Sequence, residues 1–243
     1  MRALLADAAR TLVPPKGDPH GPLPPLMLVL TVVTGLVDAV SYLGLGHVFV
    51  ANMTGNVVFL GFALAEAEGL SALASVVSLT AFLTGALAGG RFGVRFGTHR
   101  GRLLASGMTV QAVLVAGALV VALAGHDRAD AAFRYPLIVL LGLSMGLQNA
   151  TVRRLGVPDL TTTVLTRTLT GLAADSGPVG GTAPRPGRRA LSVLAMFLGA
   201  LAGAALLSVG LSVVLGAVLA LLAAGAAVLW RVSAAGAVWA AAP

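Results

Sequence analysis

Asp38 is the residue of this sequence with the most informative chemistry, because its carboxyl group lies in the middle of an apolar run. That run covers residues 26–44, and its other polar residues are only Thr, Ser and Tyr. A charged side chain at the centre of a bilayer costs at least about 2.5 kcal/mol. We therefore expect Asp38 to face the protein interior, either paired or exchanging a proton. The alternative is a structural hydrogen-bond hub in which Asp38 pairs with Asn149.

Two short segments that mix polar and apolar residues supply further groups for binding a solute. They cover residues 48–65 and 160–174. Amide, hydroxyl and backbone groups coordinate ions and polar solutes where membrane helices break. The predicted solute or ion pathway consists of Asp38, Asn52, Thr54, Asn56, Asn149, Thr166 and Arg167.

Arg167 carries the permanent charge within these two segments. A guanidinium group stays charged at physiological pH, and its shape matches carboxylate and phosphate groups. An anionic solute is therefore expected if Arg167 lines the pathway. Two alternatives are an ion pair with Asp159 or Asp175, and extension of the side chain to the cytoplasmic surface.

His47 follows a glycine at the end of the first apolar run, where it is a candidate for a pH-sensitive gate. The alternative is an ordinary residue at the membrane interface. The chain has four histidines without metal-ligand spacing and no cysteine. We therefore expect no metal and no cofactor, and no nucleotide-binding glycine motif occurs.

Ser144 lies in a pattern that resembles a catalytic motif. Residues 142–146, Gly-Leu-Ser-Met-Gly, match the G-x-S-x-G sequence of serine hydrolases. That motif requires a strand–turn–helix context, whereas this copy lies in an apolar helical run. An intramembrane hydrolase is a remote alternative, and we expect the protein not to be an enzyme.

The composition places these groups in an integral membrane protein. Of 243 residues, 57% are hydrophobic and only 10% are charged, and the mean hydropathy is +0.94. A soluble domain carries far more charge on its surface. The net charge of +7 comes largely from arginine clusters between apolar runs. This pattern is typical of cytoplasmic loops near anionic lipid, and we expect no binding of nucleic acid.

Apolar runs of about 20 residues, long enough to cross a bilayer, predict an all-α fold. These runs cover residues 26–44, 70–90, 103–124 and 135–152, and a longer run at 190–230 must fold back near Gly210. The two short polar segments either cross the membrane as well or re-enter it.

An internal repeat relates the two halves of the chain. Gly35-Leu-Val-Asp-Ala aligns with Gly146-Leu-Gln-Asn-Ala, and Thr54-Gly-Asn aligns with Thr166-Arg-Thr. In the same order, the helix-packing pattern of Gly85 and Gly89 aligns with that of Gly199 and Gly203. Small residues at this spacing let membrane helices approach closely. The constant order favours a repeat over coincidence.

The positive-inside rule decides the topology. If all eight segments spanned, a basic cluster at 91–102 or 185–189 would lie outside. If the two short segments re-enter, six helices span and both termini face the cytoplasm with every basic cluster. The result is an inverted repeat of three spanning helices plus one short re-entrant or broken helix per half. The predicted divisions are a cytoplasmic segment (1–24), two membrane repeats (25–125 and 135–231), an external link (126–134) and a tail (232–243).

Two motifs resemble the YoaK-like family of bacterial multi-pass membrane proteins. They are GLVDAVSYLGLGHVFVANMTGN at residues 35–56 and GLQNATVRRLGVPDLTTTVLT at residues 146–166. The resemblance covers nearly all of residues 25–230 and implies a membrane location and a bacterial source. The resemblance implies no substrate, no reaction and no functional residue.

The repeat and the polar residues predict a small-solute or ion transporter or channel of the bacterial inner membrane. Its site would form where the two short segments meet near the midplane, with Asp38 coupling a proton or cation. The expected partners are the lipid bilayer, a small and anionic solute, and further copies of the chain. The alternative is a structural or regulatory membrane subunit that transports nothing, and a dry, closed interior would be its sign.

Overall fold

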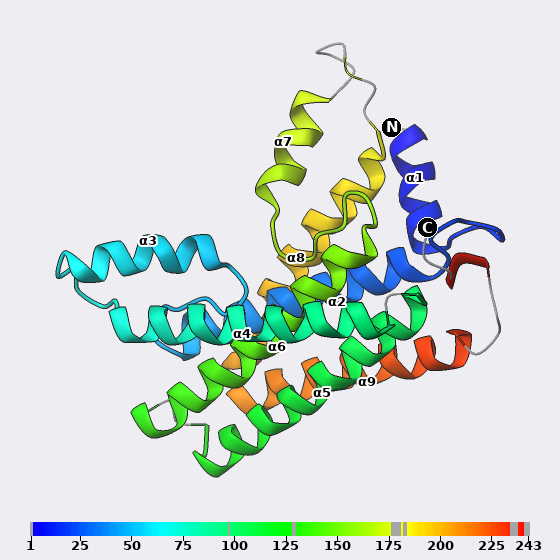
Figure 1. Ribbon diagram of the computed structural model, residues 1–243. Coiled ribbons are helices and arrows are strands. Elements are labelled where there is room, and N and C mark those ends of the chain that lie inside the picture. The colour runs from blue at the N-terminus through cyan, green and yellow to red at the C-terminus, as the bar shows by residue number, and fades with distance from the viewer. Residues whose placement is uncertain are drawn as a thin grey trace.

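The computed structural model describes residues 2–96, 98–127, 130–175, 181, 184–233 and 238–240, and each regular element in them is a helix. Six of these helices are long and apolar enough to cross a membrane (Figure 1). They are α2 (Leu23–Ala39) with the π-helical turn η1 (Val40–Gly44), α4 (Ala72–Phe96), α5 (Arg100–Ala124), α6 (Ala131–Leu155), α8 (Pro186–Leu207) and α9 (Leu211–Ser233). The predicted all-α fold with six spanning helices is confirmed for this part of the chain.

The two short polar segments form helices that are too short to span. The shorter helices are α1 (Arg2–Leu12), α3 (Met53–Leu64), α7 (Thr166–Ala174) and the 3-10 turn η3 (Val238–Ala240). At 1.5 Å per residue, α3 and α7 extend only about 18 and 14 Å, against about 30 Å of hydrocarbon. Non-helical residues precede each of them, and we call residues 45–52 the first loop segment and residues 156–165 the second loop segment.

Several helices begin earlier than the sequence predicts. The predicted apolar run begins at residue 26, but α2 begins at Leu23 and holds Pro24 and Pro25 in its first turn. The first N–H groups of a helix have no acceptor within it, so proline costs nothing at these positions. The predicted starts at 26 and 190 were wrong for this reason, since α8 also begins with a proline, Pro186.

Helices α4 and α6 are in backbone contact. A β-carbon added at Gly85 would overlap the carbonyl oxygen of Leu143, and one added at Gly146 would overlap that of Phe82. A larger residue at either glycine would push the helices apart. The small residues therefore fix which faces of α4 and α6 meet.

Helices α2 and α8 cross in the same way. A β-carbon at Gly199 would overlap the carbonyl oxygen of Val32, and one at Gly35 would lie 2.5 Å from that of Met196. Val32 precedes Gly35 by three residues, as Leu143 precedes Gly146 in the other crossing. The two crossings correspond residue for residue, and this supports the predicted repeat.

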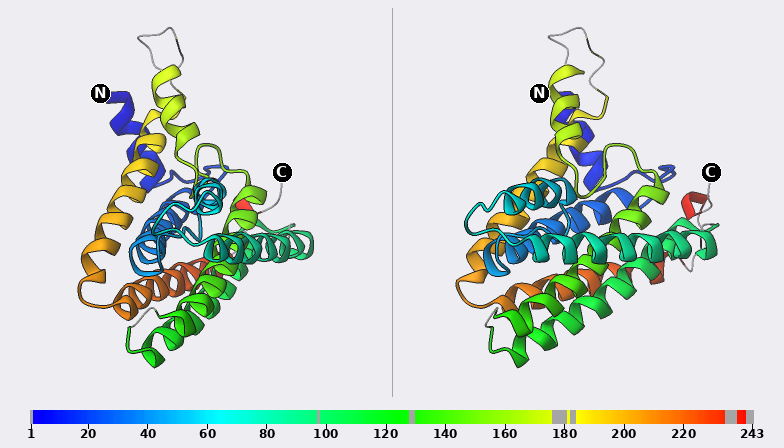
Figure 2. Two further views of the ribbon diagram at one scale, coloured as in Figure 1. Left: turned by 90° about the vertical axis from the view of Figure 1, so that its left-hand side faces the viewer. Right: turned by 60° about the vertical axis from the view of Figure 1, so that its left-hand side comes forward.

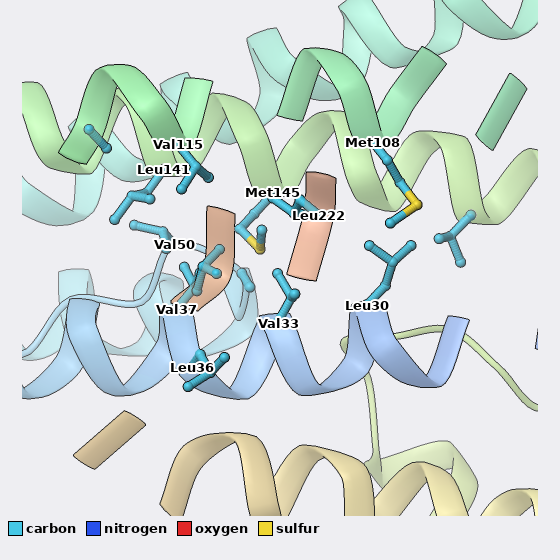
Figure 3. Close-up of a cluster of buried hydrophobic side chains, with 14 of the residues drawn as sticks. Leu30, Val33, Leu36, Val37, Val50, Met108, Val115, Leu141, Met145 and Leu222 are labelled. Carbon is cyan, nitrogen blue, oxygen red and sulfur yellow. The ribbon is translucent and has the colours of Figure 1, made fainter. Parts of the chain in front are cut away.

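The centre of the bundle is packed with apolar side chains (Figure 3). These side chains come from α2, α5, α6 and α9 and from the first loop segment, and each is at most 3% exposed. They are Leu30, Val33, Leu36, Val37, Val50, Met108, Val115, Leu141, Met145 and Leu222. The midplane is therefore closed by packing in this structure.

Consecutive spanning helices run in opposite directions (Figures 1 and 2). Most charged residues of these helices and their links stand near the helix ends in the sequence, so they lie at the two ends of the bundle. We call one end the basic end, where α4, α6 and α9 finish and α5 and α8 begin. It carries Arg91, Arg95, Arg100, Arg102, Arg153, Arg154, Arg188, Arg189 and Arg231. The opposite end carries Glu66, Glu68, Asp127, Asp130 and Arg134.

Candidate functional site

A cleft of about 1310 Å³ opens near the basic end, between α4, α6 and the second loop segment. We call it the arginine cleft. Its polar lining consists of Arg91, Arg153, Arg167, Asn149, Thr161 and Thr163. The wall that α4 provides is mainly apolar and consists of Phe82, Leu83, Ala86, Leu87, Gly90 and Val94. The cleft therefore combines cationic groups with a hydrocarbon surface.

Arg167 points to the cleft instead of pairing with an acid. Both acids expected as partners, Asp159 and Asp175, bind Arg189 at 2.9 and 2.7 Å. Arg91 and Arg153, like Arg167, are exposed, and none of the three forms an ion pair with a described residue. Three guanidinium groups are thus free to bind a carboxylate or phosphate group.

A hydrogen bond between α6 and the second loop segment lies at the cleft lining. The hydroxyl of Thr163 donates to Oδ1 of Asn149 at 2.7 Å, and Nδ2 of Asn149 donates to the carbonyl oxygen of Met145 at 3.0 Å. Both hydrogen-bonding ends of the Asn149 amide are therefore engaged. Asn149 does not contact Asp38, so the predicted pairing of these two residues is absent.

Beyond this bond, a buried polar network reaches the bundle interior. Nε2 of Gln111 donates to Oε1 of Gln148 at 2.7 Å, and Nε2 of Gln148 donates to the hydroxyls of Thr34 and Thr162 at 2.9 and 3.1 Å. All four side chains are at most 2% exposed. Thr162 precedes Thr163, so the second loop segment links the cleft to the interior.

Sequence reasoning did not single out Gln111 and Gln148. The signal was present, because a glutamine in an apolar spanning run is as unusual as the carboxylate of Asp38. The same reasoning missed Arg91 and Arg153. Both lie in basic clusters that we used only to predict which loops face the cytoplasm.

Asp38 lies in α2, in the first half of the bundle, and is partly exposed. Its Oδ1 atom is buried without a hydrogen-bond partner among the described residues, and the backbone amide of Ala51 in the first loop segment faces the carboxyl group. The π-helical turn η1 begins two residues later. Such turns are frequent at functional sites, and no charged side chain compensates Asp38 here.

Asn56 is a structural brace. Its Oδ1 accepts from the backbone N–H of Phe49 at 2.9 Å, and its Nδ2 donates to the carbonyl oxygen of Phe49 at 2.5 Å and to Ser78 at 3.1 Å. The side chain is fully buried. Its hydrogen-bonding groups hold the first loop segment and are out of reach of a solute in this structure.

The other predicted pathway residues are dispersed. Asn52 is exposed and caps α3 by accepting from the N–H of Gly55 at 3.4 Å. Thr54 in α3 and Thr166 at the start of α7 are exposed as well. The structure brings Asn149 and Arg167 into one cleft and places the remaining candidates elsewhere.

Aromatic rings close the first loop segment. The ring of Phe49 stacks on Tyr42 with centroids 5.0 Å apart and on Phe59 with centroids 5.8 Å apart. His47, the predicted gate, is exposed and packs edge-on against Tyr42 at 5.2 Å. Among the described residues, the side chain of His47 forms no ion pair and no hydrogen bond, and its role as a gate stays a prediction.

The basic end is tied together by Arg100. Its guanidinium donates to the carbonyl oxygens of Pro19 and Leu155 at 3.1 and 3.0 Å, and it contacts Nδ1 of His20 at 3.1 Å. Burial, followed by the charges of Arg100 and Arg188, lowers the pKa of His20. His20 therefore stays neutral and accepts from Arg100, which joins the N-terminal segment to the end of α6.

Ser144 lies in a regular helix and not in a hydrolase elbow. Ser144 lies within α6, is fully buried, and has no hydrogen-bond partner in the described part of the chain. The helix lacks the turn that a hydrolase elbow requires. Among the described residues, no cluster of three or more His, Cys, Asp or Glu side chains is arranged to hold a metal ion.

Comparison with known proteins places this architecture in a family. Residues 26–230 match the family described as a protein of unknown function, DUF1275. The UPF0700 transmembrane protein YoaK of Bacillus subtilis (strain 168) is 36% identical over 151 residues. That match covers 62% of this chain and 65% of the relative, so the relative is matched over less than two thirds of its length. No solved structure matches the chain.

Proposed function

The chain belongs to the DUF1275 family and is a multi-pass membrane protein, and we propose that it carries a small organic anion across the bilayer. The observation behind this proposal is the arginine cleft. It presents three exposed guanidinium groups that form no ion pair with described residues, in a volume of about 1310 Å³. Small-molecule sites commonly have such a concave form with a few polar groups.

The lining defines the chemical class of the solute. Arg91, Arg153 and Arg167 favour a carboxylate or phosphate head group. The apolar wall from α4, with Leu83 and Leu87, favours a hydrocarbon part. An organic anion with an apolar portion satisfies both walls, whereas a small inorganic anion uses only one.

The closed centre favours a carrier over an open channel. A channel needs a continuous wet path, but the interior beyond the Gln111–Gln148 network is filled by the apolar cluster of Figure 3. A carrier exposes its site to one side at a time. The arginine cleft, which opens at the basic end, is the access route that this conformation provides.

The orientation follows from charge. Arginine clusters face the cytoplasm in most inner-membrane proteins. We place the basic end, with the arginine cleft and both chain ends, on the cytoplasmic side of a bacterial inner membrane. The matching glycine crossings support an inverted arrangement of the two halves.

The experiment is uptake into proteoliposomes. Labelled unbranched monocarboxylates of increasing chain length are the probes, and inorganic phosphate tests the head group alone. We expect saturable uptake of at least one carboxylate that increases with chain length. Arg167→Gln should reduce it about 10- to 100-fold, because a hydrogen bond to a charged group contributes about 1.5–3 kcal/mol. Arg102→Gln, at an exposed arginine outside the cleft, is the matched control and should leave uptake unchanged.

A second candidate is a structural or regulatory membrane subunit without transport. The packed apolar centre and the satisfied amides of Asn56 and Asn149 favour it. Folded, reconstituted protein that takes up none of the probes would support this candidate against the carrier. An uptake that Arg167→Gln and Arg102→Gln reduce equally would show that the cleft is not the site.

A further inference from the structure

The arginine cleft has a counterpart in the other half of the chain. Asn149 and Thr163 line the cleft and bond to each other. Asp38 corresponds to Asn149, because each follows its crossing glycine, Gly35 or Gly146, by three residues. The residue that Asp38 faces, Ala51, corresponds in turn to Thr163. The same pair of positions therefore meets in both halves, with opposite orientations in the bundle.

The counterpart position is closed by rings. Tyr42 stands at the position of Arg153, and Phe49 stands at the position of Thr161 in the alignment of the halves. Their rings stack at 5.0 Å in place of the polar cleft lining. Asn56 holds Phe49 by both backbone groups and so secures this closed arrangement.

Building on the proposed carrier function, we propose that Asp38 is a proton-binding site that opens toward the opposite end of the bundle from the arginine cleft. The opening occurs when the first and second loop segments exchange their conformations, so that one half closes as the other opens. In the present conformation the second half is open, and Asp38 is partly exposed with its Oδ1 atom buried. Oδ1 of Asp38 has no hydrogen-bond partner among the described residues. It is therefore the atom that we expect water or a proton to reach once the two loop segments have exchanged conformations.

The chemistry around Asp38 selects a proton over a metal cation. Hard cations need about six oxygen ligands, whereas one backbone amide, that of Ala51, faces this carboxyl group. An ionised carboxyl group is unfavourable when one of its oxygen atoms is buried without a hydrogen-bond partner, as Oδ1 of Asp38 is among the described residues. Asp38 is therefore a neutral acid in the closed first half, and loss of its proton favours the hydrated, open first half.

Other charges do not compensate Asp38. The titratable groups on the elements that pack against α2 and η1 lie near the ends of the bundle. They are Asp7 and Arg10 of α1, Arg188 and Arg189 of α8, Arg231 of α9, Arg134, Arg153 and Arg154 of α6, and Tyr42 and His47 beside the first loop segment. Within the described part of the chain, none of them forms an ion pair or a hydrogen bond with the Asp38 carboxyl group.

The absence of native cysteine allows a direct test by single-cysteine labelling. Ala51→Cys and Thr163→Cys are introduced separately, and a membrane-impermeant maleimide is applied from either side of oriented vesicles. Thr163→Cys should react from the basic end only. Ala51→Cys should react from the opposite end only, with a rate that rises several-fold as the pH is raised.

Controls separate opening of the site from the pH dependence of the thiol. Glu66→Cys and Arg102→Cys, at exposed positions on the opposite and basic ends, supply the reference rate at each pH. Asp38→Asn mimics the neutral acid. Once the labelling rate of Ala51→Cys is divided by the reference rate at the same pH, this variant should abolish the rise of that rate with pH. If Asp38→Asn does not yield folded protein, Asp38→Leu provides a second neutral side chain.

The outcomes are decisive for this inference and distinct from those of the uptake assay. Reaction of Ala51→Cys from the basic end would overturn the inference, and so would a corrected rise that persists in the Asp38 variants. Uptake of carboxylates without the labelling pattern would leave the carrier standing and remove the Asp38 site. The labelling pattern without uptake would keep the Asp38 site and remove the proposed anion class.

Discussion

The two loop segments occupy equivalent places in the bundle but are built from different residues. The first is held by Asn56 and closed by stacked aromatic rings. The second is polar, and it joins the arginine cleft to the buried glutamines through Thr162 and Thr163. A common helical frame thus supports one closed and one open segment.

The helical frame is alike in the two halves, whereas the short polar segments are not. The frame depends on glycines whose contacts match in the two halves, at Gly85 and Gly199. The segments differ in charge, since Arg167 stands where the first half has Gly55. We propose that symmetric positions determine packing, whereas asymmetric positions determine which end of the bundle is open and what it binds.

The largest expected effect comes from the shared frame. Gly85→Leu and Gly199→Leu should each destabilise the protein by about 3 kcal/mol or more, because the side chain has no space between two backbones. Gly216→Leu is the control, since nothing lies within 4 Å of a β-carbon at Gly216. Thermal unfolding in detergent measures the effect. If one crossing tolerates leucine and the other does not, the two halves are not equivalent.

The next effect separates the two segments. Asn56→Leu leaves the backbone N–H of Phe49 without its partner and removes the bonds that Asn56 donates to the Phe49 carbonyl oxygen and to Ser78. The Ser78 hydroxyl still donates to that carbonyl oxygen at 2.6 Å, and the variant should cost about 2–3 kcal/mol. Thr168 occupies the aligned position in the second half and is also buried, so Thr168→Val serves as the matched variant and should cost less. If thermal unfolding shows that Asn56→Leu and Thr168→Val lower stability equally, the hydrogen bonds of Asn56 are not a special feature of the first half.

A smaller effect concerns the bond beside the cleft. Thr163→Val removes the hydroxyl that donates to Asn149 at 2.7 Å and should cost about 1 kcal/mol. In the first half, Ala51→Val has no such hydroxyl to lose and tests the effect of bulk alone. Unfolding curves measure both variants. Ala51→Val reports only the cost of added bulk at a buried position, and an unchanged stability of Thr163→Val would contradict a stabilising role of the bond.

The smallest effect is a pH dependence at the basic end. The pKa of His20 is lowered from its ordinary value of 6.5, chiefly by burial and then by Arg100. The unfolded chain therefore binds this proton more readily than the folded protein does. The contribution of His20 to stability is fully present above pH 6.5 and is lost as the pH falls below it. His20→Gln should make the free energy of unfolding depend less steeply on pH in the acidic range. An unchanged pH dependence would mean that another group causes it.

Much of the fold could be predicted from the sequence because length and hydrophobicity decide it. The six spans, the fold-back near Gly210 and the two short helices follow from runs of apolar residues. The resemblance to the YoaK-like family was also confirmed. The exact helix starts were less predictable, since Pro24 and Pro25 fit a first helical turn.

The site was harder to predict, because it depends on which helix faces meet. Arg91 and Arg153 lie on separate helices and line one cleft only because α4 and α6 cross closely at their glycines. Asn56 looked like a solute ligand in sequence, but its side chain forms hydrogen bonds with Phe49, Ser78 and Met53. Such partners are set by tertiary packing and leave no trace in residue spacing.

The central claim is that the two halves open reciprocally, and paired spin-label distances test it most directly. One pair joins Leu87 to Val164 across the arginine cleft, and the aligned pair joins Leu201 to Asn52 in the other half; all four positions are exposed. On moving from acidic to alkaline buffer, the first distance should shorten and the second should lengthen, and Asp38→Asn should remove both changes. Distances that stay constant, or that change in the same direction, would contradict the account.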